Sequence, residues 1–442
     1  MSDWQEYLLD DCLETLIDYR GKSPKKSPSG VPVISAKVVK GGRILHPIEQ
    51  TIEPTYYAEW MRRGYPRAGD VVLTTEGPLG EVAQLDFRTA QYALGQRIVV
   101  LRGHRDIIDN TFLKFLLLSP IGQERLSSYA TGTTVEGISQ KSLRKLRLPV
   151  PPIGLQRQIA ELLGSLDDRI ELNRQVNETL EAMAQAIFRD WFVDFGPTRR
   201  IVEGASDPVE IVGGLVTDAE RAQQLADLFP TRFGDNGLPQ GWASGAATDL
   251  IEFNPKERLR KGTVAPYTDM SSLPTAGLIA EEPVQREFGS GMRFHNGDAL
   301  LARITPCLEN GKAAFVDFLP AGQVGWGSTE FFVLRAKGEV PPPFSYLLVR
   351  LPEFRAVAIA SMTGTSGRQR AQIDRLEAFP MARPDKSVFM AFGSFVEPIF
   401  QKISGNGEEN RTLAAARDLL LPKLMSGEIR LQEADEIWEA AQ

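Results

Sequence analysis

The sequence contains a long internal repeat, and this repeat constrains the fold more than any other feature. The Gly-Asp-Val-Val-Leu run at residues 69–73 matches Gly-Asp-Ala-Leu-Leu at 297–301, and Thr-Gly-Thr at 131–133 recurs at 363–365. The members of each pair lie about 230 positions apart, far beyond the roughly 20 to 50 residues of solenoid repeats. We therefore expect two copies of one domain plan, not an array of small units.

Each half is expected to contain a β-rich domain followed by a long helix. Short runs of strand composition come first, at residues 70–75 and 97–101 in the first half, and a short helix near 112–118 follows. Prolines at 149, 151 and 152 then mark the boundary before the helical pattern. The predicted fold class is mixed α+β, with two similar α/β domains separated by long helices.

Two long amphipathic helices are predicted to pair with each other. Apolar residues recur every three or four positions up to about Phe195, and a second stripe runs from about Ser387 to Ser426 with an expected break at 404–407. Stripes from tandem halves of one chain pair most simply as an antiparallel coiled coil. The expected pairing residues are Ile159, Leu163, Leu166, Ile170, Leu180 and Ile187 in the first helix and Phe395, Ile399, Leu413 and Leu420 in the second.

Asn173 and Asn177 fall near the predicted seam between these helices. One interpretation places both side chains on a solvated face. The other is that a buried asparagine fixes the register of the pair, at some cost in stability. The sequence leaves both interpretations open.

The repeat and the helices divide the chain into six expected segments. They are a first domain at residues 1–150, a central helix at 151–195, an irregular acidic linker at 196–236 with a helical stretch near 218–227, a second domain at 237–384, a C-terminal helix at 385–428 and an acidic tail at 429–442.

Composition argues against several classes of protein. The chain has only two cysteines and three histidines, widely scattered, so neither a disulfide framework nor a metal site is expected. Its apolar runs are far shorter than the roughly 20 residues that cross a bilayer, and residues 1–6 carry no secretion signal. We therefore expect a cytoplasmic protein that binds no membrane.

The charge is polarised along the chain, although the net charge is -7. Residues 20–43 carry seven cations and no acidic residue, whereas acidic residues gather at 203–227 and after 428. Flexible cations of this kind suit phosphate oxygens, and residues 256–261 supply a counterpart in the second half. The alternative is a solvated basic loop.

The central helix resembles a known family. Residues 148–173, 177–184 and 191–195 resemble the central conserved region of the specificity subunits of type I restriction-modification systems, and 419–429 resembles their closing helix. The resemblance covers nearly the whole chain. It implies a non-catalytic subunit that reads a bipartite DNA target with two target-recognition domains and recruits modification and restriction subunits through its helices.

Motifs that would support catalysis are missing. We find neither a GxxxxGK[ST] nucleotide loop nor the Asn/Asp-Pro-Pro-aromatic tetrapeptide of adenine methyltransferases. Asp167 and Asp168 are interpreted as solvated helix residues, not as a metal-binding pair. We therefore assign no catalytic residue and no cofactor, and we expect S-adenosylmethionine and ATP only on partner subunits.

The remaining candidates are DNA-binding residues. Cations are expected at phosphates, the threonine loops either clamp the DNA backbone or cap the segment that follows, and Gln96, Arg97 and Arg303 are candidates for base edges. The full set is Arg20, Lys22, Lys25, Lys26, Lys37, Arg43, Gln96, Arg97, Thr131, Thr133, Thr134, Lys256, Arg258, Arg260, Lys261, Arg303, Thr363, Thr365, Arg368 and Arg370.

Two other classes of function fit the sequence less well. A self-sufficient nuclease or methyltransferase conflicts with the missing motifs, and a coiled-coil adaptor that binds only proteins conflicts with the duplicated domains and their matched basic loops. The expected partners are double-stranded DNA, modification (methyltransferase) subunits and restriction (motor-nuclease) subunits.

Overall fold

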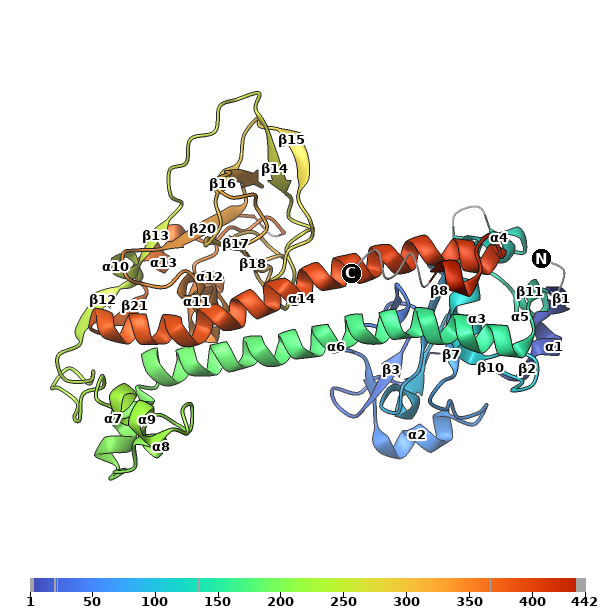
Figure 1. Cartoon of the computed structure of the whole chain (residues 1–442), viewed down its shortest axis with the longest axis horizontal. Coiled ribbons are helices and arrows are strands. Elements are labelled where there is room, and N and C mark those ends of the chain that lie inside the picture. Colours follow the sequence, from blue (N-terminus) through green and yellow to red (C-terminus); the bar gives the residue numbers. More distant parts are fainter. Residues whose placement is uncertain (1–3, 20, 22, 133–134, 366, 435–442) are drawn as a thin grey trace. The chain divides into compact units, whose positions relative to one another are not determined.

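The computed structural model describes residues 4–434 except positions 20, 22, 133, 134 and 366. The chain forms two compact units, the first from residues 1–171 and 410–442 and the second from residues 172–409. Two long helices, α6 (Ile153–Phe192) and α14 (Lys386–Ser426), contribute residues to both units (Figure 1).

The first unit is built on a four-stranded antiparallel sheet in the order β2-β10-β7-β8, with a second sheet in the order β6-β3-β9. The strands of the first sheet are β2 (Leu13–Asp18), β10 (Ile98–Gly103), β7 (Val71–Thr75) and β8 (Leu79–Gln84). The strands of the second sheet are β6 (Thr51–Ile52), β3 (Val31–Ile34) and β9 (Ala93–Leu94). Two further two-stranded sheets pair β1 (Gln5–Leu8) with β11 (Arg147–Val150) and β4 (Val39–Lys40) with β5 (Arg43–Ile44).

Strand β7 is buried on both faces, which fits the apolar run of its first three residues, Val71 to Leu73. Side chains alternate between the faces of a strand. Val71 and Leu73 lie in a core cluster with Leu163 of α6, whereas Val72 packs with Val33 of the second sheet.

Short helices complete the first unit. They are α1 (Leu9–Cys12), α2 (Pro54–Trp60), the single 3-10 turn η1 (Thr89–Gln91), α3 (Asn110–Leu118), α4 (Pro120–Ser128) and α5 (Gln140–Arg144). The carboxylate of Asp109 accepts hydrogen bonds from the backbone N–H groups of Thr111 and Phe112, so α3 begins at a side-chain cap.

The second unit repeats this plan, which confirms the predicted fold class. Its main sheet has the order β13-β20-β17-β18, its second sheet β15-β14-β19-β16, and β12 pairs with β21. In each unit the second sheet contains one parallel pair, β3 with β9 and β14 with β19. The strands are β12 (Ala243–Ala246), β13 (Ile251–Phe253), β14 (Val264–Thr268), β15 (Val284–Glu287), β16 (Met292–Phe294), β17 (Ala299–Ala302), β18 (Ala313–Phe315), β19 (Gly325–Gly327), β20 (Phe331–Ala336) and β21 (Pro380–Arg383).

The short helices of the second unit include three in a segment that was expected to be irregular. The helices are α7 (Gly196–Val202), α8 (Pro208–Ile211), α9 (Ala219–Ala226), α10 (Ala247–Leu250), α11 (Pro343–Arg350), α12 (Pro352–Ala360) and α13 (Ile373–Glu377). The prediction of an irregular segment at 196–236 was wrong for α7 and α8. Leu225 and Phe229 lie in the same core as Trp191, and the rings of Trp191 and Phe229 are 5.0 Å apart.

The long helices pack side by side and run antiparallel, as predicted (Figure 1). In the second unit Asn173 donates a hydrogen bond to Glu409 at 3.0 Å, and further along, the rings of Phe192 and Phe389 stack at 5.6 Å. The partner number on α14 falls as the number on α6 rises, which defines the antiparallel direction. The expected pairing residues are buried or half-buried in the two large cores, Ile159, Leu163, Leu166, Ile170, Leu413 and Leu420 in the first unit and Leu180, Ile187, Phe395 and Ile399 in the second.

The expected break at 404–407 does not occur, because α14 is continuous there. The amide of Asn406 donates a 2.7 Å hydrogen bond to the side-chain oxygen of Asn177. A Cβ atom on Gly407 would lie 2.7 Å from Cδ1 of Ile279, so α14 packs closely against the Ile279 side chain at this position. Helix pairing and packing thus outweigh the low helix propensity of glycine and asparagine.

Both predicted seam asparagines have partners on α14. Asn173 is buried, so the solvated interpretation is wrong for it, and Asn177 is half-buried and bonds to Asn406 and to the carbonyl of Ile403. That these side chains set the register of the helices stays a prediction.

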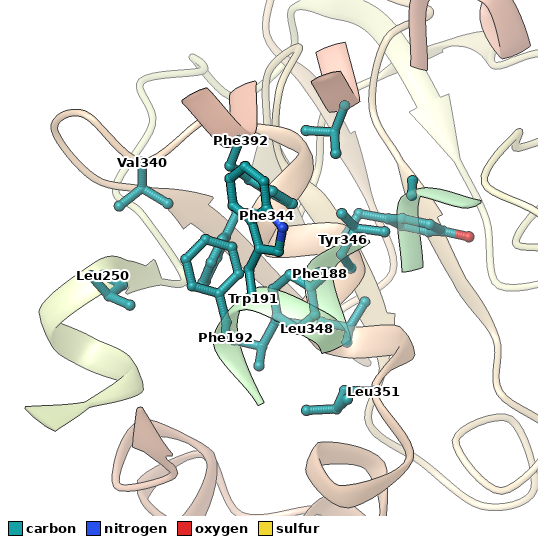
Figure 2. Close-up of a cluster of buried hydrophobic side chains, with 14 of the residues drawn as sticks. Phe188, Trp191, Phe192, Leu250, Val340, Phe344, Tyr346, Leu348, Leu351 and Phe392 are labelled. Carbon is teal, nitrogen blue, oxygen red and sulfur yellow. The ribbon is translucent and has the colours of Figure 1, made fainter. Parts of the chain in front are cut away.

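The seam in the second unit is aromatic. Figure 2 shows Phe188, Trp191 and Phe192 of α6 against Phe344 of α11 and Phe392 of α14. Ring centroids lie 4.9 Å apart for Phe188 with Phe344 and for Phe192 with Phe392. Both contacts are edge-to-face, which aromatic rings prefer over direct stacking.

Asp167 corrects another expectation, because it is not a solvated residue. Its carboxylate lies 2.5 Å from Nζ of Lys114 and 2.8 Å from Nη1 of Arg417, so it joins α3, α6 and α14 within the first unit. Burial raises the pKa of Asp167, but the charge of Lys114 and the hydrogen bonds from Lys114 and Arg417 outweigh it and hold the pKa below its usual value. Asp168 is exposed, as expected.

Candidate nucleic-acid interface

A junction in the first unit forms where β7 ends and β10 begins. The N–H of Thr75 donates to the carbonyl of Arg97 at 2.8 Å, and the N–H of Ile138 donates to the carbonyl of Thr75 at 2.9 Å. Gly137 forms bridges with both Glu76 and Thr131. Three segments that are far apart in the sequence therefore meet at one end of the sheet.

Arg97 is the exposed cation of this first junction. Its Nε lies 3.1 Å from Oε1 of Glu76, and its side chain is 54% exposed. Its backbone φ is 63°, in the left-handed region that costs energy for any residue with a Cβ atom. The junction therefore keeps an arginine where the backbone favours glycine.

A polar hollow of about 520 Å³ adjoins this junction. Asp18, Arg63, Thr131 and Ser139 line it, together with Glu76, the partner of Arg97. Among the described residues, the buried hydroxyl of Thr75 on the same wall has no hydrogen-bond partner.

The second unit has the equivalent junction, where β17 ends and β20 begins. The N–H of Arg303 donates to the carbonyl of Glu330 at 3.0 Å, and the N–H of Ala371 donates to the carbonyl of Arg303 at 2.8 Å. The backbone of Arg370 forms β-bridges with Ile304 and Thr363, as the backbone of Gly137 does with Glu76 and Thr131 in the first unit. Backbone bonding therefore makes Arg303 the counterpart of Thr75, and Glu330 the counterpart of Arg97.

Glu330 lies between two arginines at the second junction. It accepts hydrogen bonds from Nε of Arg303 at 3.1 Å and from Nε and Nη2 of Arg370, the latter at 2.7 Å. The hydrogen bond from Arg370 lowers the pKa of Glu330 most, and Arg303 lowers it further against the opposing effect of burial. This carboxylate is therefore ionised at neutral pH, and Arg303 and Arg370 are held beside each other.

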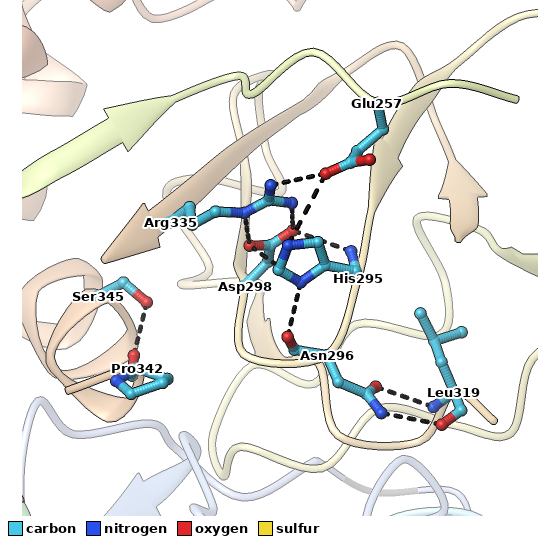
Figure 3. A network of polar contacts seen from close by, with 8 residues as sticks. All are labelled: Glu257, His295, Asn296, Asp298, Leu319, Arg335, Pro342 and Ser345. Atoms are coloured by element: carbon cyan, nitrogen blue, oxygen red, sulfur yellow. Dashed lines mark hydrogen bonds and ion pairs between the residues drawn. The ribbon is translucent and has the colours of Figure 1, made fainter. Parts of the chain in front are cut away.

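At the other end of the same strands lies an ion pair that the two units share. Asp70 binds Arg102 in the first unit through Oδ1 at 2.8 Å and Oδ2 at 2.7 Å, and Asp298 binds Arg335 through both oxygens at 2.7 Å. In the second unit Glu257 adds a second carboxylate, 2.6 Å from Nη1 of Arg335 (Figure 3). These pairs connect neighbouring strands of the main sheets and belong to the frame of each unit.

The predicted basic segments occupy equivalent connections between the two sheets of each unit. Residues 20–30 connect β2 to β3, and residues 254–263 connect β13 to β14. The described cations in and near these segments are exposed, namely Lys25, Lys26, Lys37 and Arg43 in the first unit and Lys256, Arg258, Arg260 and Lys261 in the second. Arg20 and Lys22 lie outside the described residues.

The threonine loops lie at the junctions. Thr131 pairs with Gly137, which also pairs with Glu76 beside Arg97, and Thr363 pairs with Arg370 beside Arg303. Thr365 and Arg368 are exposed and Gln96 is half-buried, whereas Thr133 and Thr134 lie outside the described residues. The structure thus brings Arg97 close to Thr131, and Arg303 close to Thr363 and Arg370.

Sequence reasoning missed the two glutamates, Glu76 and Glu330, because its candidates were cations, threonines and Gln96 and included no acidic residue. A usable signal was present, since Glu76 follows directly on a strand that the repeat identifies. Its pairing with Arg97, however, depends on the tertiary contact between β7 and β10.

The described part of the chain also lacks two other kinds of site. It contains no group of three His, Cys, Asp or Glu side chains arranged to hold a metal ion, and none of its helices combines the length and apolarity needed to cross a membrane.

Comparison with known proteins identifies relatives over the full length of the chain. A family model for the type I restriction modification DNA specificity domain matches residues 1–182. The specificity subunit of type I restriction enzyme HindI from Haemophilus influenzae is 23% identical over 97% of this chain and 100% of its own length. The MjaIX specificity subunit from Methanocaldococcus jannaschii is 24% identical over 87% of this chain and 83% of its own length.

A solved structure also shares the fold. The crystal structure of the type I restriction-modification S subunit from M. genitalium matches with a TM-score of 0.52 at 16% identity, over 96% of each chain.

Proposed function

The chain belongs to the family of type I restriction-modification specificity subunits, and we propose that it selects the DNA target of such a complex by reading one part of a split sequence with each unit. In this family the methyltransferase and endonuclease activities reside in partner subunits, and the specificity subunit carries no cofactor. Its task is therefore binding and recruitment, not catalysis.

The observation that carries this proposal is the duplicated plan with matched basic connections. The connections from β2 to β3 and from β13 to β14 each present exposed cations at the same place in the topology. Cations of this kind neutralise phosphates and position a protein on DNA without specifying sequence. Two similar but non-identical binding surfaces in one chain suit a target with two different halves.

We assign the partner-binding role to the long helices. Modification and restriction subunits are the expected protein partners, and α6 and α14 offer exposed side chains along their length, including Leu172, Met183, Met390 and Leu419. Met183, for example, is 48% exposed, so it is available to a partner.

Methylome sequencing of cells that carry this chain with its modification subunit tests the proposed function. We expect methylation in a motif with two specific parts and a non-specific gap, absent from cells with the modification subunit alone. An undivided motif, or methylation that does not depend on this chain, would contradict the proposal. The purified chain alone should neither methylate nor cut DNA.

The basic connection can be tested separately with the double variant Lys25→Ala and Lys26→Ala. If both lysines bind phosphates, the slope of log affinity against log salt should fall by about 0.9 for each phosphate that is no longer neutralised, with the target preference unchanged. Replacing Lys141 and Lys145, which are exposed in the same unit, is the matched control. A changed target with an unchanged salt slope would show that Lys25 and Lys26 contact bases instead.

A further inference from the structure

Each junction holds an arginine that a glutamate contacts at Nε and not at its terminal nitrogens, whereas Arg370 of the second junction binds Glu330 through both Nε and Nη2. In the first unit the pair is Arg97 with Glu76 at 3.1 Å, and in the second it is Arg303 with Glu330 at 3.1 Å. Among the described residues, neither arginine has a hydrogen-bond partner for its terminal Nη1 and Nη2 groups. The side chains are 54% and 33% exposed, so these donors are accessible.

An arginine held in this way presents two parallel donors. The O6 and N7 atoms of guanine in the major groove are two adjacent acceptors, and bidentate binding by arginine is the commonest specific base contact. A carboxylate beside Nε, hydrogen-bonded to Arg303 and ion-paired with Arg97, restricts the guanidinium group and leaves the terminal pair for the base. In the second unit the guanidinium of Arg303 also lies 5.7 Å from the ring centroid of Phe332, which further restricts its movement.

The arginine held by the glutamate comes from a different strand in each unit. By backbone bonding, Arg97 corresponds to Glu330, and Arg303 corresponds to Thr75. The arginine therefore comes from the start of β10 in the first unit and from the end of β17 in the second. The buried pairs behave differently, because Asp70 with Arg102 and Asp298 with Arg335 keep the same positions in both units.

This contrast separates a structural role from a functional one. Ion pairs as exposed as that of Arg97 contribute little to stability, so stability alone gives little reason to keep an arginine at a φ of 63°. Moving the guanidinium group to the other strand changes which base pair it can reach. A shared junction would then serve two different half-sites.

We infer that Arg97 and Arg303 are the specificity-determining residues of the two units, each contacting a guanine base edge, with Glu76 and Glu330 as their positioning residues. This inference rests on the proposed function and deepens it. Arg370 binds the other side of Glu330, so the second junction offers an additional cation beside the base-contacting one.

The test uses the complex of the full chain with its modification subunit. DNA bound by the complex is selected from a library that contains the wild-type motif and all its single base-pair replacements. Arg97→Ala should reduce discrimination at one guanine-containing position of one half-site by roughly tenfold or more, with the other half-site unchanged. Arg303→Ala should have the same effect in the other half-site only.

Conservative variants and matched controls separate base contact from loss of charge or of folding. Arg97→Lys and Arg303→Lys keep the cation but lose the paired donors, so they should bind DNA and still lose discrimination. Arg105→Ala and Arg383→Ala remove exposed cations elsewhere in the first and second unit, and both should keep the full motif. Glu76→Gln should weaken discrimination at the same position as Arg97→Ala, which a purely structural pair would not do.

Two results would overturn the inference. One is full discrimination at every position in the lysine variants. The other is a uniform loss of affinity in both half-sites with a smaller salt slope, which would make these arginines phosphate contacts. If the wild-type complex selects no split motif, the proposed function fails; if it does and the variants keep that motif, this inference alone fails.

Discussion

The two units share an inner ion pair and differ at the exposed end of the main sheet. The inner pair is Asp70 with Arg102 in the first unit and Asp298 with Arg335 in the second. The exposed end carries Arg97 and Glu76 in the first unit, but Arg303, Glu330 and Arg370 in the second. The inner pair joins equivalent strands in both units. The outer set differs in residue type and in the strand from which each charge comes. A duplicated domain thus keeps the contacts that hold its strands together and differs where a ligand can touch it.

The largest effect is expected from breaking the shared inner pair. Asp70→Ala leaves Arg102 without its two-oxygen partner and removes the bond from the Arg67 N–H, so it should lower the free energy of unfolding by about 3 to 5 kcal/mol. Asp298→Ala removes the same two kinds of contact but should cost less, because Glu257 still binds Arg335. Chemical denaturation of the full chain measures both, and Arg97→Ala, which should change stability little, is the control. An unchanged unfolding midpoint for either aspartate variant would refute the idea of a common frame.

The helix seam also differs between the two units, because it is aliphatic in the first unit and aromatic in the second. Phe192→Ala should cost about 3 to 5 kcal/mol and Leu163→Ala about 2 to 5 kcal/mol, since both side chains are almost fully buried. Each loss of stability should appear mainly in the unfolding of the unit that contains the substitution. Hydrogen exchange of the backbone amides measures this. Equal loss of protection in both units from either variant would show instead that the helices unfold as one element.

The asparagine contact should have a smaller effect. Asn406→Ala leaves the side-chain oxygen of Asn177 without its 2.7 Å donor and should cost about 1 to 3 kcal/mol. Replacing both Asn177 and Asn406 by Leu removes donor and acceptor together and should cost less than the single change. A double-mutant cycle measures this coupling, and a coupling of zero would argue that the two side chains do not stabilise each other.

The smallest effect is expected from the pH dependence of Asp167. Because its pKa is lowered in the folded chain, the carboxylate stabilises the fold above its usual pKa of 3.8, and this stabilisation is lost as the pH falls through the lowered value. The unfolding free energy of the wild type should therefore fall more steeply below about pH 5 than that of Asp167→Asn. Parallel curves for the two proteins would mean that Lys114 and Arg417 do not lower this pKa.

Much of the architecture could be predicted because its signals are local or periodic. The repeat at an offset of about 230 residues predicted two similar domains, and the apolar stripes predicted α6 and α14 nearly to their ends. Local propensity failed at 404–407, where the contacts with Asn177 and Ile279 keep α14 continuous. It failed again at α7 and α8, which are short helices in a core supplied by other parts of the chain.

The sequence by itself determined the duplicated fold, the long helices, the buried strands and the family, because each of these depends on residue type and spacing along the chain. The tertiary structure alone decided which charges meet. Glu76 pairs with Arg97, and Glu330 with Arg303 and Arg370, because neighbouring strands and a returning loop bring together residues that are 21 to 40 positions apart. Pairing over such separations depends on strand order and register, and neither composition nor periodicity specifies which of many arginines will face a given carboxylate.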